Sequence, residues 1–408
     1  MIILHTSDWH IGHTLYGRQR HEEYEALLRW LLQVLQEEQV DLLLIAGDIF
    51  DSPLPGTRAL SYYYRLLAAS VRYCRHVVVI GGNHDSPALL DGPAALLQEL
   101  RVHVIGGKRA DVADEVLLLR RPDGTPELLL AAVPFLRERD LRTPSPGESA
   151  EEKEQQLLQG LQNHYQAVVA QAKQIREQWQ QPLPLLVTGH LFISGCPVSG
   201  DEGMRDLYVG NLGQIPVALL PEEIDYLALG HLHRAQKVQG SERIRYSGSP
   251  LPLGFADGKH PKSMTLLSLE PTACNCRLLP VPCWQTLQTI RGSWSEIESR
   301  LQQLRLAGSS AWLEIIHEGK EILGNLRERI EAITASSTLQ VLRIKEQRLI
   351  EQALHQQYDE DDGYDLDPLQ VFQHCLQQHG IETEQQILLQ QAFAEILHSL
   401  DLPADEES

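Results

Sequence analysis

Five short polar motifs carry the side chains of this chain that could do chemistry, and each stands at the end of an apolar run. They are Asp8-Trp9-His10, Gly47-Asp48-Ile49-Phe50-Asp51, Gly81-Gly82-Asn83-His84-Asp85, Gly189-His190 and Gly230-His231-Leu232-His233. Carboxylate, imidazole and amide ligands suit Mn, Fe or Zn, whereas a cysteine-rich site would favour structural zinc or iron–sulfur clusters. The residue types therefore indicate a metal site of the kind found in hydrolases.

The apolar runs before these motifs indicate how the motifs are positioned. The runs read MIILHTS, VDLLLIA, HVVVI, PLLVT and IDYLAL. Short continuous apolar runs bounded by Gly or polar residues are typical of buried strands in a parallel sheet. Because ligands bind outside the carboxyl ends of strands in open α/β sheets, we expect all five motifs at one sheet edge. The glycines beside the ligands let the backbone turn sharply there.

Side chains of this kind at one edge could surround two metal ions. Two cations about 3.5–4 Å apart need a bridging ligand, and a carboxylate can bridge because it has two oxygens. We expect Asp48 to be the bridge, since it follows the second strand in the middle of the set. Such a metal pair activates water and stabilises the attacking and leaving oxygens of an in-line displacement at phosphorus. The pattern therefore predicts a two-metal phosphoesterase.

Each motif also has an ordinary structural explanation. A strand-end Asp is often a helix N-cap or a turn residue, and this explanation stays open for Asp51 and Asp85. An ordered series of five motifs, all after strand-like runs, is much harder to obtain by chance than any one of them. The metal site is therefore the main hypothesis.

The series DxH, GDxxD, GNHD, GH and GHxH resembles the signature of the calcineurin-like metallophosphoesterases. Within that superfamily, the stretch LHTSDWHIGHTLYGRQRHEEY and the later Tyr246-Ser247-Gly248-Ser249-Pro250 are similar to the SbcD-like bacterial nuclease subunits, over roughly residues 1–280. Protein Ser/Thr phosphatases differ, because they have Arg and Glu where this chain has Ser52 and Asp85. The resemblance implies an α/β sandwich of two mixed β-sheets flanked by helices, a small α+β capping domain and a C-terminal helical tail.

The resemblance also implies seven ligands for two divalent cations, most often Mn. One metal would be held by Asp8, His10, Asp48 and His233, and the other by Asp48, Asn83, His190 and His231. His84 would be the catalytic histidine that is not a ligand, and Asp85 the carboxylate that orients its ring. Asp51 falls where relatives place a residue that helps to position the DNA backbone. Its role stays open, because some relatives have His there.

The family likeness further implies a metal-dependent DNA nuclease subunit with double-strand exonuclease and single-strand or hairpin endonuclease activity. It would work with an SbcC-type SMC-like ATPase in DNA end processing, repair, recombination and replication, as a homodimer within a heterotetramer. Two alternatives remain. One is a calcineurin-like phosphodiesterase that acts on small nucleotides, and the other is a non-catalytic scaffold for DNA ends.

The charge of the chain is concentrated near its C-terminus. The net charge is −20, which at first argues against a DNA substrate. Residues 346–408 contain fifteen acidic residues and one base, so the preceding 345 residues carry only −6. Two bound divalent cations would add positive charge at the sheet edge that carries the five motifs. No basic patch is obvious, and we expect a partner to supply much of the grip on DNA.

Three further features of the sequence indicate the cellular compartment of the protein. No run of about 18 apolar residues occurs, so no membrane span is expected. The first residues lead straight into the strand before Asp8, which leaves no room for a removable signal peptide. The six cysteines are scattered without zinc-finger spacing and are interpreted as reduced thiols. The expected location is cytoplasmic, associated with the nucleoid.

Changes of pattern along the chain predict four parts. They are a nuclease domain at 1–283, a capping domain at 284–347, an acidic linker at 348–367 and a helical partner-binding tail at 368–408. In the first part we expect helices at 22–39, 57–73, 87–100 and 148–181, a hairpin at 116–134, strands at 184–189, 225–230, 243–247 and 263–269, and a surface loop at 194–213.

The last two regions with a regular pattern contain no metal-ligand motif. The capping region reads as a β-α-β-α-β unit, which either shapes access for DNA, as the resemblance implies, or only packs. The tail has one apolar helix face, formed by Leu389, Phe393, Ile396, Leu397 and Leu400. Two short helices bury such a face poorly alone. We expect them to dock on the coiled coil of the SbcC-type ATPase, although folding back on the chain is the alternative.

Overall fold

The computed structural model describes residues 1–179, 182–196, 214–270, 273–319 and 325–346. Contacts divide the chain into one unit at Met1–Glu346 and another at Gln347–Ser408. The expected acidic linker and helical tail, and most of the expected loop at 194–213, lie outside the described residues. The proposed division near residue 283 therefore concerns the first unit alone.

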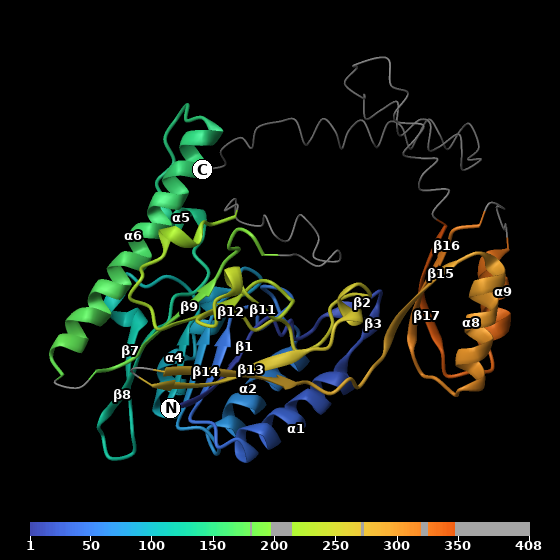
Figure 1. The fold of residues 1–408 in the computed structure, drawn as a ribbon, viewed down its shortest axis with the longest axis horizontal. Helices are drawn as coiled ribbons and strands as arrows, with labels where there is room; N and C mark the ends of the chain where they lie inside the picture. The colour runs from blue at the N-terminus through green and yellow to red at the C-terminus, as the bar shows by residue number, and fades with distance from the viewer. Residues whose placement is uncertain (180–181, 197–213, 271–272, 320–324, 347–408) are drawn as a thin grey trace. The chain divides into compact units, whose positions relative to one another are not determined.

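The first sheet has six strands, and Figure 1 labels three of them, β1, β13 and β14. In spatial order they are β14 (Ala273–Pro280), β13 (Ser263–Glu270), β1 (Ile2–Thr6), β4 (Leu42–Ala46), β5 (His76–Ile80) and β6 (Val102–Ile105). The four strands β1, β4, β5 and β6 are parallel to one another. Strands β13 and β14 are antiparallel to their neighbours. The sheet is therefore mixed, as expected, and three of the five motifs follow its parallel strands.

The second sheet also has six strands. They are β11 (Gln236–Lys237), β12 (Ile244–Tyr246), β10 (Tyr226–Gly230), β9 (Leu185–His190), β8 (Pro126–Ala131) and β7 (Val116–Arg120), in that order. The central four are parallel, and the two edge strands are antiparallel. The last two motifs follow β9 and β10, so the ligands come from two sheets and not from one.

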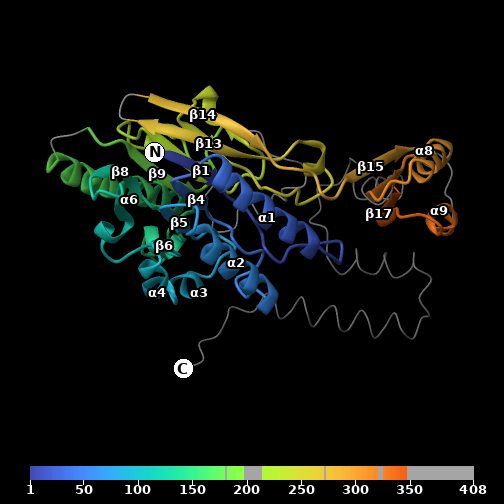
Figure 2. The ribbon, with the colours of Figure 1, turned by 90° about the horizontal axis from the view of Figure 1, so that it is seen from below.

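Each sheet buries both of its faces, which explains the continuous apolar runs. In β4, Leu42 and Leu44 pack into the core between the sheets, whereas Leu43 and Ile45 face the helices α1 (His21–Glu37) and α2 (Thr57–Ser70). The two helices lie next to each other against the first sheet (Figure 2). Helix α6 (Ala150–Glu177) covers the outer face of the second sheet. The result is the helix–sheet–sheet–helix sandwich that the family resemblance implied.

One local prediction was wrong, and one strand was not predicted. The helix expected at 87–100 is two short helices, α3 (Pro87–Asp91) and α4 (Ala94–Glu99), because Pro93 has no amide hydrogen to continue the helix. Strand β14 was not predicted, since most of its residues are at least partly exposed and its sequence, ACNCRLLP, has a weak apolar pattern.

The remaining elements of the first unit are short or belong to the capping region. They are β2 (Thr14–Leu15), β3 (Arg18–Gln19), α5 (Glu138–Leu141), β15 (Leu287–Gly292), α8 (Trp294–Leu306), β16 (Trp312–His317), α9 (Leu326–Thr334) and β17 (Gln340–Glu346). The last five form the expected β-α-β-α-β unit around a parallel three-stranded sheet. Among the described helices, none is both long and apolar enough to cross a bilayer.

Candidate metal centre

The carboxyl ends of the strands converge through unusual backbone turns. The turn after β1 is fastened to the turn after β4, since the amides of Asp8 and His10 donate to the carbonyls of Gly47 and Asp48, both at 3.0 Å. Asp8, His10, Asp48 and His231 have φ values of 53°, 45°, 50° and 100°. Such left-handed conformations are rare for residues with a side chain and cluster at functional sites.

Three glycines allow the strand ends to approach closely. A Cβ atom on Gly82 would lie 2.1 Å from Asp48 Oδ1, and one on Gly47 would lie 2.2 Å from His190 Nδ1. A Cβ atom on Gly230 would lie 2.0 Å from the carbonyl oxygen of Ala46. No larger residue fits at these three positions without moving a ligand or a strand.

Asp48 lies at the centre of the site, as predicted. Its Oδ2 is 3.1 Å from His190 Nε2 and 3.7 Å from His10 Nε2, and its Oδ1 accepts a hydrogen bond from the amide of His84 at 2.9 Å. Burial opposes ionisation of this carboxyl, yet His190 and His10 outweigh it and hold the pKa of Asp48 well below its usual range. An ionised carboxylate between two sets of imidazoles suits a bridging ligand.

The structure brings the seven expected ligands together in two overlapping groups. Asp8, His10 and His233 each offer an atom within 4.8 Å of the others, and Asp8, Asp48 and His190 do the same. Asn83 completes the second group, because its Oδ1 lies 3.0 Å from His190 Nε2 and 3.1 Å from His231 Nδ1. His84, His10 and Asp48 form a further group of the same size, so distance alone does not separate His84 from the ligands.

His10 provides a test of whether these residues fit a cation. Both ring nitrogens are buried and neither has a hydrogen-bond partner among the described residues, although Nδ1 is 3.4 Å from Asp51 Oδ1. A buried polar atom without a partner costs about 1–3 kcal/mol. A cation bound at Nε2 would satisfy that nitrogen, and Asp51 would then orient the ring from its other side, as carboxylates beside ligating histidines do. The donor set therefore fits a divalent metal.

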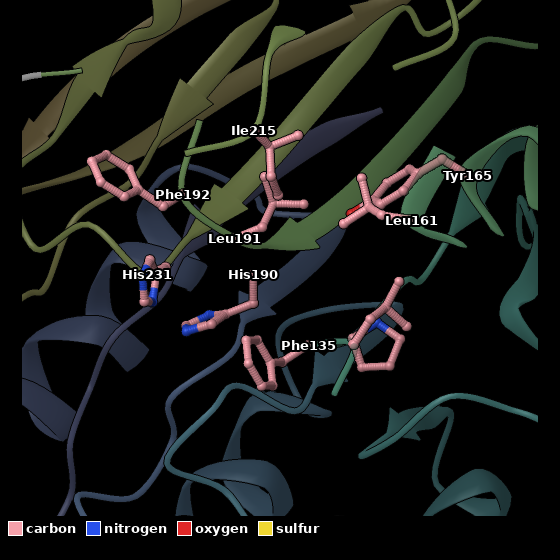
Figure 3. Close-up of a pocket in the computed structure, with 10 residues that line it drawn as sticks. Phe135, Leu161, Tyr165, His190, Leu191, Phe192, Ile215 and His231 are labelled. Carbon is pink, nitrogen blue, oxygen red and sulfur yellow. The ribbon is translucent and has the colours of Figure 1, made fainter. Parts of the chain in front are cut away.

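His190 and His231 are held by their surroundings in orientations that suit ligands. The His190 Nδ1 atom lies 2.9 Å from the carbonyl oxygen of Ala46, which leaves Nε2 facing Asp48 and Asn83. The ring of Phe135 meets the His190 ring edge-on at 6.3 Å, and His231 lies on its other side at 5.3 Å (Figure 3). This aromatic packing restricts rotation of the imidazoles.

The protonation of the two histidines differs for physical reasons. Burial lowers the pKa of His231 to about 3, so its ring is neutral and able to bind a cation. Burial also opposes protonation of His190, but the charge of Asp48 is stronger and raises the pKa of His190 to about 9. Without metal, His190 therefore carries a proton at neutral pH, and a cation would displace it.

His84 and Asp85 have different partners from those expected. The Asp85 carboxylate accepts hydrogen bonds from three backbone amides, those of Gly82 at 2.8 Å, Ile49 at 3.1 Å and Phe50 at 3.0 Å. The expected contact with the His84 ring is absent among the hydrogen bonds of the described residues, and His84 Nδ1 lies 3.1 Å from the carbonyl oxygen of Asp51 instead. Asp85 thus ties two ligand turns together, and the backbone of Asp51 orients the ring.

The helix-capping alternative for Asp51 and Asp85 does not hold. Helices α2 and α3 begin at Thr57 and Pro87, and neither has a side-chain cap. The Asp51 carboxylate instead contacts His13 Nδ1 at 3.0 Å and His10 Nδ1 at 3.4 Å. Burial opposes ionisation of Asp51, but these histidines lower its pKa.

Sequence reasoning missed His13. Its Nδ1 faces the Asp51 carboxylate, and its Nε2 is 3.1 Å from the carbonyl oxygen of Leu253. The ring therefore links Asp51 to a segment about 200 residues further along the chain. His13 follows no strand and belongs to none of the five motifs. The signals in the sequence were its position three residues after His10 and its place in the stretch LHTSDWHIGHTLYGRQRHEEY.

The Ser247-Gly248-Ser249-Pro250 segment noted in the sequence holds the turn that carries His233. The amide of Ser249 donates to the carbonyl oxygen of His233 at 3.0 Å, and Lys262 Nζ donates to the same oxygen at 3.0 Å. Lys262 is paired with Asp257 at 2.5 Å and donates to Ser249 Oγ at 2.9 Å. A small buried ionic cluster therefore holds the turn that carries His233, one of the expected ligands.

Comparisons with known proteins agree with this geometry. Residues 1–235 match the calcineurin-like phosphoesterase family, and residues 283–380 match the family described as type 5 capsule protein repressor C-terminal domain (SbcD_C). The chain is 35% identical to the SbcD subunit of nuclease SbcCD from Escherichia coli strain K12 over 98% of both chains. It is 38% identical to the Rhodobacter capsulatus protein of that name over 69% of both, and 32% identical to the Bacillus subtilis one over 66% of this chain and 67% of the relative.

Proposed function

This chain belongs to the calcineurin-like phosphoesterases and, within them, to the SbcD family, and on that basis we propose that it is the nuclease subunit of an SbcCD-type complex. Its reaction is metal-dependent hydrolysis of DNA phosphodiesters, by exonuclease action on double-stranded ends and endonuclease action on single strands or hairpins. Its processes are DNA repair, recombination and replication. The observation that carries the proposal is the cluster of overlapping groups Asp8/His10/His233, Asp8/Asp48/His190 and His10/Asp48/His84, two of which contain Asp48.

Seven side chains supply the proposed ligands. Asp8, His10, Asp48 and His233 form one set, and Asp48, Asn83, His190 and His231 form the other. When bound, two divalent cations, which we propose to be Mn, would supply positive charge at phosphorus and a nucleophilic water for in-line attack. The chain itself holds the ligands in place before binding, through the fastened turns and the aromatic packing described above.

His84 acts on the leaving oxygen in this proposal. Its Nδ1 is engaged by the carbonyl of Asp51, so Nε2 is the atom available to substrate. Its amide donates to Asp48, which links the position of the ring to the bridging carboxylate. A protonated Nε2 donates a hydrogen bond, or a proton, to the oxygen that departs from phosphorus. His84 is therefore assigned as the catalytic acid and not as a ligand.

The partner is an SbcC-type SMC-like ATPase. The relatives are named as the SbcD subunit of SbcCD, and the family match to residues 283–380 extends from the capping region into the tail. We assign the apolar face of the C-terminal helices to this partner, with two copies of the chain in a heterotetramer at the cytoplasmic nucleoid. The acidic tail makes DNA binding by this chain alone weak, so the partner contributes to DNA binding.

The test compares two variants with the wild type. Cleavage of a linear duplex and of a DNA hairpin is measured with Mn, with and without the ATPase and ATP, beside Mn binding by calorimetry. His84→Gln should keep both cations and lose about 10²-fold or more of its cleavage rate, because only the acid is removed. Asp48→Asn should lose metal and cleavage together, since the bridging carboxylate is gone.

Each outcome bears on one assignment. Near-normal turnover by His84→Gln would overturn the catalytic role of that histidine. Full Mn occupancy in Asp48→Asn would overturn the bridging role. A wild type that leaves every DNA substrate intact but hydrolyses small nucleotide phosphodiesters would replace the nuclease proposal with the small-nucleotide alternative.

A further inference from the structure

Arg137 lies beside the metal centre and belongs to none of the five motifs. It stands between β8 and α5, and its backbone amide donates to Asp140 Oδ2 at 2.9 Å, which fixes the start of that helix. Its side chain is half-buried and points back toward the ligand turns. There Nη2 donates to the carbonyl oxygen of Asp85 at 2.9 Å, and the guanidinium lies over the ring of Phe135 at 5.7 Å.

These two contacts place the guanidinium beside the residue that follows His84 and beside the ring that packs on His190. Asp85 is the residue after His84 in the chain. Phe135 packs edge-on against His190, and the two rings lie side by side in Figure 3. The positive charge is therefore held near the ligand turns, and Asp48 is among the carboxylates that act on it.

The guanidinium has hydrogen-bonding capacity left over. It carries five N–H donors, and in the described part of the chain one hydrogen bond uses them. No carboxylate of the described residues forms an ion pair with Arg137. Nearby Arg142, in contrast, is paired with both Glu138 and Glu148. A half-buried arginine without such a pair is notable in a chain of net charge −20, where carboxylates are abundant.

Burial of this cation also has an energetic cost. Desolvation lowers the pKa of Arg137 below its usual value, although the side chain remains charged at neutral pH. The carboxylates of Asp140, Asp85 and Asp48 favour the charge of Arg137 at longer range, but none of them forms an ion pair with it among the described residues. A partly desolvated cation without a direct anionic contact gains stability when a ligand supplies the anion. Guanidinium groups match phosphate oxygens with two parallel N–H donors, which makes phosphate the natural candidate.

We propose that Arg137 binds a non-bridging oxygen of a phosphate in the DNA strand held at the metal centre. This inference rests on the proposed nuclease function and adds a substrate-binding residue to it. The hydrogen bond to the Asp85 carbonyl and the Phe135 ring hold the side chain in place before DNA arrives. The remaining N–H groups then face the phosphate. The competing explanation is that Arg137 only fastens the turn that carries Asp85.

The experiment uses the full chain with Mn and compares Arg137→Gln and Arg137→Lys with Arg139→Gln. Arg139 is the matched control, because it is exposed and lies two residues further along the same segment. Duplex cleavage is measured over a range of salt concentrations, beside hydrolysis of bis(p-nitrophenyl) phosphate and Mn binding by calorimetry. Arg137→Gln should lower kcat/KM on DNA by about 10-fold or more and reduce the salt slope of DNA binding by about one.

The controls separate substrate binding from a structural role. The Mn stoichiometry of Arg137→Gln should stay at the wild-type value. Arg139→Gln should stay within about twofold of the wild type in every assay. Arg137→Lys should recover part of the lost activity, because it keeps the charge. A loss on both substrates assigns Arg137 to the scissile phosphate, and a loss on DNA alone assigns it to a neighbouring phosphate. Unchanged kcat/KM on DNA, or loss of Mn in parallel with activity, would overturn the inference. Failure of the wild type to cleave DNA would overturn the nuclease proposal instead.

Discussion

At the scale of single residues, buried histidines set how this fold responds to acid. His5 lies in β1, where its Nδ1 is 3.2 Å from the hydroxyl of Tyr226 in the second sheet. Burial lowers the pKa of His5 from 6.5 to about 3, with a smaller effect from Arg245. The unfolded chain binds a proton at this residue between pH 6.5 and pH 3, and the folded chain does not. Stability is therefore lost as the pH falls below 6.5.

This histidine gives a prediction for acid unfolding. His5→Gln removes the titrating group and keeps an acceptor for Tyr226, so the metal-free variant should lose less stability in acid than the metal-free wild type. The gap should grow by about 1 kcal/mol for each pH unit between about 6.5 and 4.5. Urea unfolding of both proteins at about pH 7.5, 6.5, 5.5 and 4.5 measures it. Parallel losses in the two proteins would show that His5 does not carry the acid sensitivity.

The residues at the site differed in how well they could be predicted. Asp48 and His190 were found because they directly follow strand-like runs, and the position of a strand end depends on the local pattern. The hydrogen-bond partners of Asp85 could not be predicted, because a carboxylate can accept from the amides of any turn that the fold brings near it. His13 and Arg137 were missed for the same reason, since their contacts to Leu253 and Asp85 span long stretches of sequence.

At the scale of elements, the site depends on how closely the strand ends approach. Gly82→Ala would place a methyl group 2.1 Å from Asp48 Oδ1 and 2.3 Å from its amide nitrogen. The turns must then separate, so we expect loss of at least one Mn and a stability loss of about 1–3 kcal/mol. Mn calorimetry and urea unfolding measure the two effects.

The matched control for this change is Gly124→Ala in the β7–β8 hairpin. Gly124 has a φ of 85°, and a Cβ atom there would meet nothing within 4 Å, so alanine strains the backbone without touching the site. It should cost about 1 kcal/mol of stability and leave Mn binding unchanged. Full Mn stoichiometry in Gly82→Ala would show that the strand ends tolerate the extra atom.

The elements themselves were largely predictable, and their assignment to sheets was not. The strand before Asp48 was predictable from the sequence, because its five consecutive residues are all buried and pack alternately into the hydrophobic cores on the two faces of the sheet. Nothing in the local pattern of β9 says that it pairs with β8 and β10 and not with β4. Sheet membership depends on contacts between distant segments, and a single sequence does not contain that information in its periodicity.

At the scale of the whole molecule, charge and chemistry are separated along the chain. All seven proposed ligands lie within Met1–Glu346. Deletion of residues 347–408 removes fourteen acidic residues and one base, which changes the net charge from −20 to −7. The truncated chain should keep Mn binding and hydrolysis of a small phosphodiester within about twofold, since the metal centre is intact. It should also lose association with the SbcC-type ATPase.

Two assays check this truncation. Co-purification with the ATPase reports on the partner contact, and binding to a duplex at low salt reports on charge, because the less acidic chain should bind DNA more tightly by itself. A truncated chain that still co-purifies with the ATPase would place the partner contact in residues 1–346. Loss of Mn binding would show that the tail supports the metal centre, as expected if the helices fold back.

The left-handed backbone at Asp8, His10, Asp48 and His231 has a consequence for selectivity. Each such residue lowers the free energy of unfolding by about 1–2 kcal/mol, and the folded chain already includes this loss before any cation binds. The ligand cage is therefore preformed and does not adapt to whichever ion enters. An ion of the wrong radius or preferred coordination must bind with distorted bonds, or move a backbone that two sheets hold in place. We therefore expect discrimination between metals of similar charge to depend on the conformation of the backbone as well as on the proposed ligands.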